Sequence, residues 1–91
     1  MLRDLDTQRI FHEPVNVTEV TDYLTKIKEP MDFSKMQEKL DCMEYTTFGQ
    51  FDADFNLMIN NCLKYNPKNN IFHKLAFKMR EHVRRFSIIV F

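Results

Sequence analysis

The side chains in this 91-residue chain that most often perform catalysis are three histidines, two cysteines and a pair of neighbouring aspartates. They are His12, His73, His82, Cys42, Cys62, Asp52 and Asp54. Two positions apart, the aspartates point to different faces of a helix and cannot share a proton. Cys62 and His73 would be the candidate nucleophile and base, but a cysteine on an apolar helix stripe is usually a small buried hydrophobe. The sequence has no Gly-rich phosphate loop, HExxH or GxSxG motif. The cysteines lack metal-ligating neighbours. We therefore expect no enzyme, no catalytic residue, no cofactor and no metal site.

The stretch "NNCLKYNPKNNIF", residues 60–72, suits binding better. Asn66 ends an amphipathic run, directly after Tyr65 and four residues after Cys62, and Phe72 follows six residues later. Taken alone, each has a structural explanation, since Asn66 could cap a helix and the others could be core. Together with Val15 and Tyr23 from an apolar upstream segment, they can line a pocket that holds one oriented amide.

An apolar pocket with a single amide suits a neutral, extended ligand that carries one carbonyl. A bare lysine ammonium would lose hydration worth several kcal/mol there and find no counter-charge. Acetylation removes that charge and supplies the carbonyl. The side-chain NH₂ of Asn66 can donate to it, and the hydroxyl of Tyr23 can reach it through a water molecule.

Three helices and one long loop are expected to position these residues. The helices are predicted at 32–41, where Asp32 is an N-cap, at 47–65, where Thr47 and Gln50 form a capping box, and at 71–88. Pro67 should end the second of them near Asn66. Residues 9–31 mix β-branched residues with two prolines and should form an ordered loop. Its apolar residues are expected to pack on the helices: Phe11, Val15, Val17, Val20, Tyr23, Leu24 and Ile27.

Composition and charge limit the function classes. The chain is 44% hydrophobic and 29% charged, as expected of one globular domain, and its two cysteines indicate a reducing compartment. No segment resembles a signal peptide or approaches membrane-spanning length, so no membrane partner is expected. Residues 1–60 carry twelve acidic and six basic side chains, whereas residues 61–91 carry one and seven. The acidic part would attract a cationic partner, and the basic part could contact phosphates.

Two long patterns resemble the bromodomain family over nearly the whole chain. They are "DYLTKIKEPMDFSKMQEKL" and "FDADFNLMINNCLKYN", which is followed by the proline. The resemblance implies an all-α, left-handed four-helix bundle over residues 1–91. Its first helix would be severely truncated, to about residues 2–8. The ZA loop (9–31) and the BC loop (66–70) would form the acetyl-lysine pocket, with helices at 32–41, 47–65 and 71–88.

The resemblance also assigns roles to individual residues. Asn66 matches the acetyl-binding asparagine and Tyr23 the water-holding tyrosine. In "RIFHEPV", Ile10 and Phe11 match the hydrophobic shelf, with Arg9 where many members have tryptophan, and Pro14 and Val15 match the pocket wall. Phe72 matches the gatekeeper at the pocket entrance, and Cys62 and Tyr65 complete the site.

The form of these motifs is similar to that of the bromodomain and PHD-finger scaffold proteins of MYST-type histone acetyltransferase complexes. We therefore expect a nuclear histone-tail reader of acetylated H3 or H4 within a larger chromatin protein, with other complex subunits as further partners. The alternatives are a bundle used for protein assembly with a degenerate pocket, or a nucleic-acid-binding bundle. The latter would use the basic last helix, through Lys74, Lys78, Arg84 and Arg85.

Overall fold

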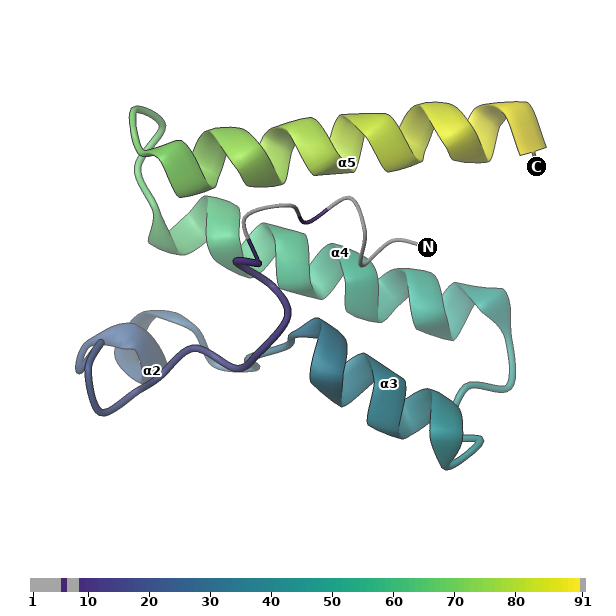
Figure 1. Cartoon of the computed structure of the whole chain (residues 1–91), viewed down its shortest axis with the longest axis horizontal. Coiled ribbons are helices and arrows are strands. Elements are labelled where there is room, and N and C mark those ends of the chain that lie inside the picture. The colour runs from purple at the N-terminus through teal and green to yellow at the C-terminus, as the bar shows by residue number, and fades with distance from the viewer. Residues whose placement is uncertain (1–5, 7–8, 91) are drawn as a thin grey trace.

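The computed structural model describes residue 6 and residues 9–90, with side chains as far as residue 84. Its helices are α2 (Tyr23–Lys26), α3 (Phe33–Asp41), α4 (Phe48–Tyr65) and α5 (Ile71–Val90) (Figure 1). This part of the chain contains no strand, and the prediction of an all-helical domain is confirmed. Apart from Asp6, the helix expected at residues 2–8 lies outside the described residues.

Helix α4 is the central element, and both of its ends are determined locally. The Thr47 side chain accepts a hydrogen bond from the Gln50 backbone N–H, and the Gln50 side chain accepts one from the Thr47 N–H, which confirms the predicted capping box. At the other end Asn66 is extended, with φ −98° and ψ 132°, as the following Pro67 favours. Phe55, Met58 and Ile59 are the buried part of its apolar stripe. Phe48 lies on the same predicted stripe, but at the first turn, and is 56% exposed.

Helix α3 begins at the predicted cap and buries Phe33 and Met36. The Asp32 carboxylate accepts from the backbone N–H groups of Ser34 and Lys35. Its C-terminus closes with Met43 in the left-handed region, at φ 58°, and with paired bonds from Met43 N to Leu40 O and from Glu44 N to Lys39 O. This pattern is a Schellman motif in which methionine occupies the position that usually holds glycine.

Helix α5 returns antiparallel to α4 and lies beside it in Figure 1. Ala76 and Met79 carry its contact with the core, and Val83 packs at the edge of the same cluster. Ile71 and Phe72, in the first turn, are exposed instead. The hairpin therefore presents its connection, residues 66–70, next to exposed aromatic and aliphatic side chains.

Residues 9–31 lie across one end of these helices and contain one feature that the sequence did not predict. Helix α2 is a single turn, and four residues are too few to produce a periodic pattern. Phe11, Tyr23 and Ile27 anchor the segment in the core. The expectation that all its apolar residues pack is wrong at three positions, which are exposed: Val15, Val17 and Leu24. Among the described residues, no helix is both long enough and apolar enough to cross a bilayer.

Candidate functional site

Asn66 is the C-cap of α4, and its polar groups are held at short range. Its backbone N–H donates to the Cys62 carbonyl at 3.0 Å. Its side-chain Nδ2 also donates to that carbonyl, at 3.1 Å, and lies 3.4 Å from the Cys62 sulfur. Since sulfur is a weak acceptor, the second N–H of the amide has a poor partner. The half-buried amide is thus oriented by the helix end and retains donor capacity for a carbonyl.

The surroundings of Cys62 do not favour a nucleophile. Desolvation by burial raises the pKa of its thiol to about 11, although the hydrogen bond from Asn66 acts in the opposite direction. The thiol therefore stays protonated at neutral pH and donates to the Phe72 carbonyl at 3.5 Å. His73 does not serve it as a base, because the His73 Nδ1 atom lies 2.8 Å from the Asn66 backbone oxygen.

Tyr23 brings the ZA loop to the same place. Its side chain is buried, and its ring packs at a tilt against Tyr65, with 5.0 Å between the centroids. Burial raises the pKa of its hydroxyl, and the nearby Cys62 adds to the rise. No described residue makes a hydrogen bond to that hydroxyl, so it is available to a water molecule or a ligand.

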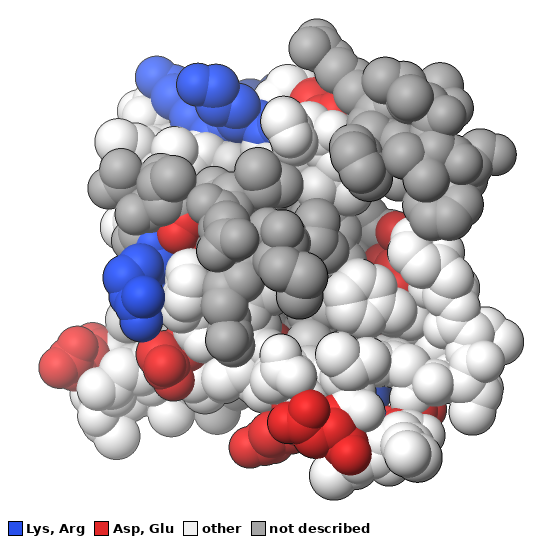
Figure 2. All heavy atoms as spheres, turned by 45° about the vertical axis from the view of Figure 1, so that its right-hand side comes forward, with Lys and Arg blue, Asp and Glu red and all other residues white. Residues whose placement is uncertain are grey.

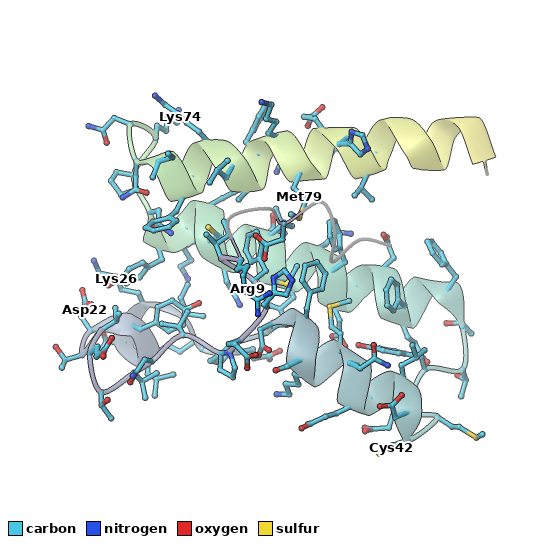
Figure 3. All side chains as sticks on the ribbon, in the orientation of Figure 1. Arg9, Asp22, Lys26, Cys42, Lys74 and Met79 are labelled. Atoms are coloured by element: carbon cyan, nitrogen blue, oxygen red, sulfur yellow. The ribbon has the colours of Figure 1, made fainter. Side chains whose placement is uncertain are left out.

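Tyr65 ties the end of α4 to the start of α2. Its hydroxyl donates to Asp22 Oδ1 at 2.6 Å, and Lys26 lies over its ring and 3.5 Å from the other Asp22 oxygen. Figure 3 shows Asp22 and Lys26 together at this end of the molecule. The hydrogen bond from Tyr65 holds the pKa of Asp22 below its usual value, and the same bond raises the pKa of Tyr65. The aromatic residue on the predicted stripe is therefore a loop tether as well as a packing residue.

The predicted shelf is built around a buried carboxylate. Asp6 accepts from the backbone N–H groups of Ile10 (2.9 Å) and Phe11 (2.6 Å), and from His12 Nδ1 at 2.9 Å. Phe11 is buried against Phe33 with an edge-to-face geometry, whereas Ile10 is half-buried. Asp6 also contributes to the raised pKa of Cys62, which places the shelf within electrostatic range of the pocket wall.

The remaining predicted site residues are exposed. Pro14 and Val15 follow the shelf directly, and Val15 is 37% exposed. Phe72 is 44% exposed, and its backbone N–H donates to Asn70 Oδ1. Hydrogen bonds thus join Asn66, Cys62 and Phe72, a ring contact joins Tyr65 and Tyr23, and the electrostatic effect of Cys62 on Tyr23 links the two groups. Among the described residues, no hydrogen bond, ion pair or ring contact ties Pro14 or Val15 to them.

Sequence reasoning missed four residues that hold the site together. Asp6 organises the shelf, Asp22 receives Tyr65, His73 bonds to the Asn66 backbone, and buried Asn61 donates to the Glu29 carbonyl at 2.8 Å. Of the four, only Asn61 could have been noticed in the sequence. It lies among the apolar residues of its helix, and a buried amide needs a polar partner. The other three partners lie outside any local pattern.

A separate open groove of about 530 Å³ lies between residues 28–31, α3 and α4. Its lining alternates lysines with carboxylates, and Asp54 accepts from both Lys39 and Tyr45 there. None of the predicted site residues lines this groove. Within the described residues, no three His, Cys, Asp or Glu side chains gather as a metal would require.

The comparisons with known proteins agree on one family. The bromodomain family model matches residues 2–78. The chain belongs to the bromodomain family. Its members read acetyl-lysine in chromatin proteins and share the left-handed four-helix bundle, and a bromodomain is a binding module rather than a catalytic one.

Relatives of this bromodomain include proteins from animals, fungi and trypanosomes. It is 49% identical over 81 residues to human "Bromodomain and PHD finger-containing protein 3", covering 89% of this chain and 7% of that protein. To the "Histone acetyltransferase GCN5" of Debaryomyces hansenii it is 45% identical over 71 residues, 78% of this chain and 16% of that one. A Trypanosoma brucei bromodomain solved with bromosporine superposes with a TM-score of 0.85 at 36% identity, covering 88% of this chain and 70% of that one.

The similarity to the bromodomain and PHD-finger proteins that the motifs indicated is confirmed. The chain spans less than a fifth of the length of these two curated relatives. They are chromatin-associated proteins, and what they do as whole proteins is a property of those longer chains.

Proposed function

We propose that this bromodomain binds acetyl-lysine through Asn66, with the pocket formed by the ends of α4 and α5 and by the ZA loop. The observation that carries the proposal is the Asn66 amide, whose second N–H faces only the sulfur of the neutral Cys62 thiol. An acetyl carbonyl is a stronger acceptor than that sulfur. A bare ammonium would face no carboxylate there, because Asp22 is engaged by Tyr65 and Asp6 by the shelf.

The other predicted residues have supporting roles in this proposal. Tyr23, a buried residue whose hydroxyl is not bonded by any described residue, would hold the water that reaches the acetyl oxygen. Cys62 and Tyr65 would line the channel. The apolar walls and rim would come from Ile10, Phe11, Pro14, Val15 and Phe72.

The expected affinity is modest. Burying about five methyl or methylene groups at ~0.8 kcal/mol each gives ~4 kcal/mol. One hydrogen bond adds ~1 kcal/mol net. After the cost of ordering the peptide, the dissociation constant should lie at roughly tens of micromolar to millimolar. Desolvation of the charged lysine, more than the hydrogen bond, would distinguish the acetylated form.

The proposed ligands are acetylated tails of histones H3 and H4, encountered in the nucleus as part of a longer chromatin protein. Glu13 and Glu19, exposed on the ZA loop beside Val15, offer carboxylates to the basic residues of such tails. Asp22 is less available for this purpose than the sequence indicated, since Tyr65 and Lys26 already engage it. Other subunits of a histone acetyltransferase complex would contact other regions of that longer protein.

Calorimetric or NMR titration with acetylated and unmodified H3 and H4 peptides tests the proposal. The acetylated peptides should bind, and Asn66→Ala should weaken that binding about tenfold, because it leaves the buried acetyl carbonyl without a donor. Asn60→Ala, an exposed change on the same helix, is the matched control and should bind as the wild type does. Equal binding of both peptide forms, or unchanged binding by Asn66→Ala, would contradict the proposal.

We propose a contact with nucleic acid as a second, weaker function, located on α5. Lys74 and Lys78 lie four residues apart on one exposed face, and His82 continues that face. Neither lysine has an ion-pair partner among the described residues, whereas Arg84 is paired with Glu81. Figure 2 shows a basic cluster at the upper left, on the side of α5, and the largest acidic cluster at the bottom, with single acidic side chains elsewhere in this view. This face is complementary to a phosphate backbone.

Binding of a short DNA duplex at several salt concentrations tests this second function. The logarithm of the affinity should fall with the logarithm of the salt concentration, with a slope near −2 for two phosphate contacts. Lys74→Gln with Lys78→Gln should remove most of that slope, whereas Lys35→Gln on α3 should leave it unchanged. A slope that the α5 substitutions do not alter would refute the contact.

A further inference from the structure

His73 lies in the first turn of α5 and forms a bond that the sequence could not indicate. Its Nδ1 atom is 2.8 Å from the backbone oxygen of Asn66, and the ring is half-buried. A peptide oxygen only accepts hydrogen bonds, so Nδ1 must carry the proton. In the neutral ring, this requirement selects the Nδ1–H tautomer.

The backbone oxygen of Asn66 has few other hydrogen-bond donors available to it. It belongs to the last carbonyls of α4, which have no partners within the helix, and the next residue is Pro67, which has no N–H. Among the described residues, His73 is the one donor recorded for it. Because the Asn66 N–H donates to the Cys62 carbonyl, both backbone polar groups of Asn66 are held. Their two bonds fix φ and ψ, and hence the direction in which the amide side chain leaves the backbone.

A second link between the same two helices is weaker. The Cys62 thiol donates to the Phe72 carbonyl at 3.5 Å, and a thiol is a poor donor. The connection between the gatekeeper turn and the asparagine therefore depends chiefly on His73. Residues 67–70 between them form only a local turn, from Asn70 N to Pro67 O.

We infer that His73 is a positioning residue for acetyl-lysine binding. It acts through the Asn66 carbonyl, holds the amide in its binding orientation and keeps Phe72 at a fixed distance from it. The inference rests on the proposed function of Asn66, but it concerns a residue outside the ligand pocket. His73 touches the backbone of the binding residue and need not touch the ligand.

Two substitutions separate positioning from packing. His73→Phe keeps a planar ring but removes the donor, and it should weaken binding of an acetylated peptide about fivefold. His73→Asn retains an amide N–H near the place of Nδ1 and should recover most of that loss. His82→Phe, an exposed change on the same helix, is the control and should bind as the wild type does. Melting curves of all variants identify any that fail to fold.

The ring tautomer provides a readout that does not depend on the ligand. In ¹⁵N NMR spectra of the free wild-type protein with a neutral ring, His73 should carry its proton on Nδ1. An Nε2–H tautomer, or wild-type affinity in His73→Phe, would overturn the inference. If the wild type bound no acetylated peptide, the proposed function and the role of His73 would fail together, whereas wild-type binding that His73→Phe leaves unchanged would overturn the role of His73 alone.

Discussion

The α4–α5 hairpin and the ZA loop are the two sides of the proposed pocket, and they are held in different ways. The hairpin side is determined by residues that are close in sequence. Thr47 and Gln50 cap the start of α4, and Asn66 caps its end through its bonds to the Cys62 carbonyl. The ZA loop has one helical turn of its own, α2. Its course is determined by hydrogen bonds to side chains outside residues 9–31, one just before the loop and two on α4.

Three such side chains account for most of the loop's tethering. Asp6 gathers the backbone of the shelf, Asn61 holds the Glu29 carbonyl across 32 positions, and Tyr65 holds Asp22 across 43. Two of the three lie on α4, so this helix, whose ends are determined locally, holds the ZA loop in place. Breaking a tether should change the loop and the affinity while leaving the helices intact.

Asp6→Ala is the change with the largest expected effect. It removes a buried carboxylate that accepts three hydrogen bonds and leaves the Ile10 and Phe11 N–H groups without partners. We expect the free energy of unfolding to fall by about 3 kcal/mol, measured by urea denaturation. Glu13→Ala, an exposed carboxylate in the same loop, is the control and should change it little. A loss equal to that of Glu13→Ala would mean that the shelf does not depend on Asp6.

Asn61→Ala breaks the middle tether. The change strands the Glu29 carbonyl and should cost about 2 kcal/mol of unfolding free energy. Amide NMR shifts should move at residues 28–31, and helix α5 should keep its spectrum. Asn60→Ala, the exposed neighbour, separates this loss from helix propensity. If both variants lost the same unfolding free energy, the hydrogen bond from Asn61 to the Glu29 carbonyl would not contribute to stability.

Met43→Gly tests the locally determined region instead, and in the opposite direction. Met43 is 85% exposed and holds φ at 58°, a conformation that costs a residue with a Cβ roughly 1 kcal/mol more than glycine. The substitution should stabilise the protein by about that amount without changing affinity for an acetylated peptide. Met43→Ala removes the same side chain but keeps the strain, so it should not stabilise. Equal melting temperatures for the two variants would contradict this account.

The same division explains what the sequence could predict. The capping box, the Asp32 cap and the end of α4 before Pro67 are all written in residues within four positions of one another. Such signals can be read without knowledge of the fold. Helix α2 was missed because a single turn has no periodicity. The buried shelf could not be derived from the sequence. Asp6 reaches the N–H groups of Ile10 and Phe11 only because the chain turns at Arg9, whose φ of 56° lies in the left-handed region.

For the site, the motifs predicted residue types better than contacts. Asn66, Cys62 and Phe72 were placed together by spacing along one helix and one short loop, and the structure joins them by hydrogen bonds. Phe11 entered the site through the family resemblance and Val15 already through the apolar upstream segment, and one is core while the other is exposed. His73 was considered only as a base, since a bond to a backbone oxygen seven residues earlier leaves no trace in residue type.

Tyr65→Phe should have the smallest effect and a distinctive dependence on pH. The hydroxyl bond lowers the folded-state pKa of Asp22, so its contribution is fully present above the unfolded value of about 3.9 and is lost as pH falls through the lower, folded one. The same bond raises the pKa of Tyr65, so its contribution is present below about pH 10 and is lost as pH rises through the higher, folded value.

The stability difference between wild type and Tyr65→Phe should therefore be constant between about pH 5 and pH 9 and shrink on both sides. Urea midpoints across that range measure it. Asp22→Asn, which removes the charge but keeps the size, should abolish the acid dependence and leave Tyr65→Phe with little further effect in the double variant. A difference that persisted unchanged to about pH 2 would show that the Tyr65 hydroxyl does not act through the ionised Asp22 carboxylate.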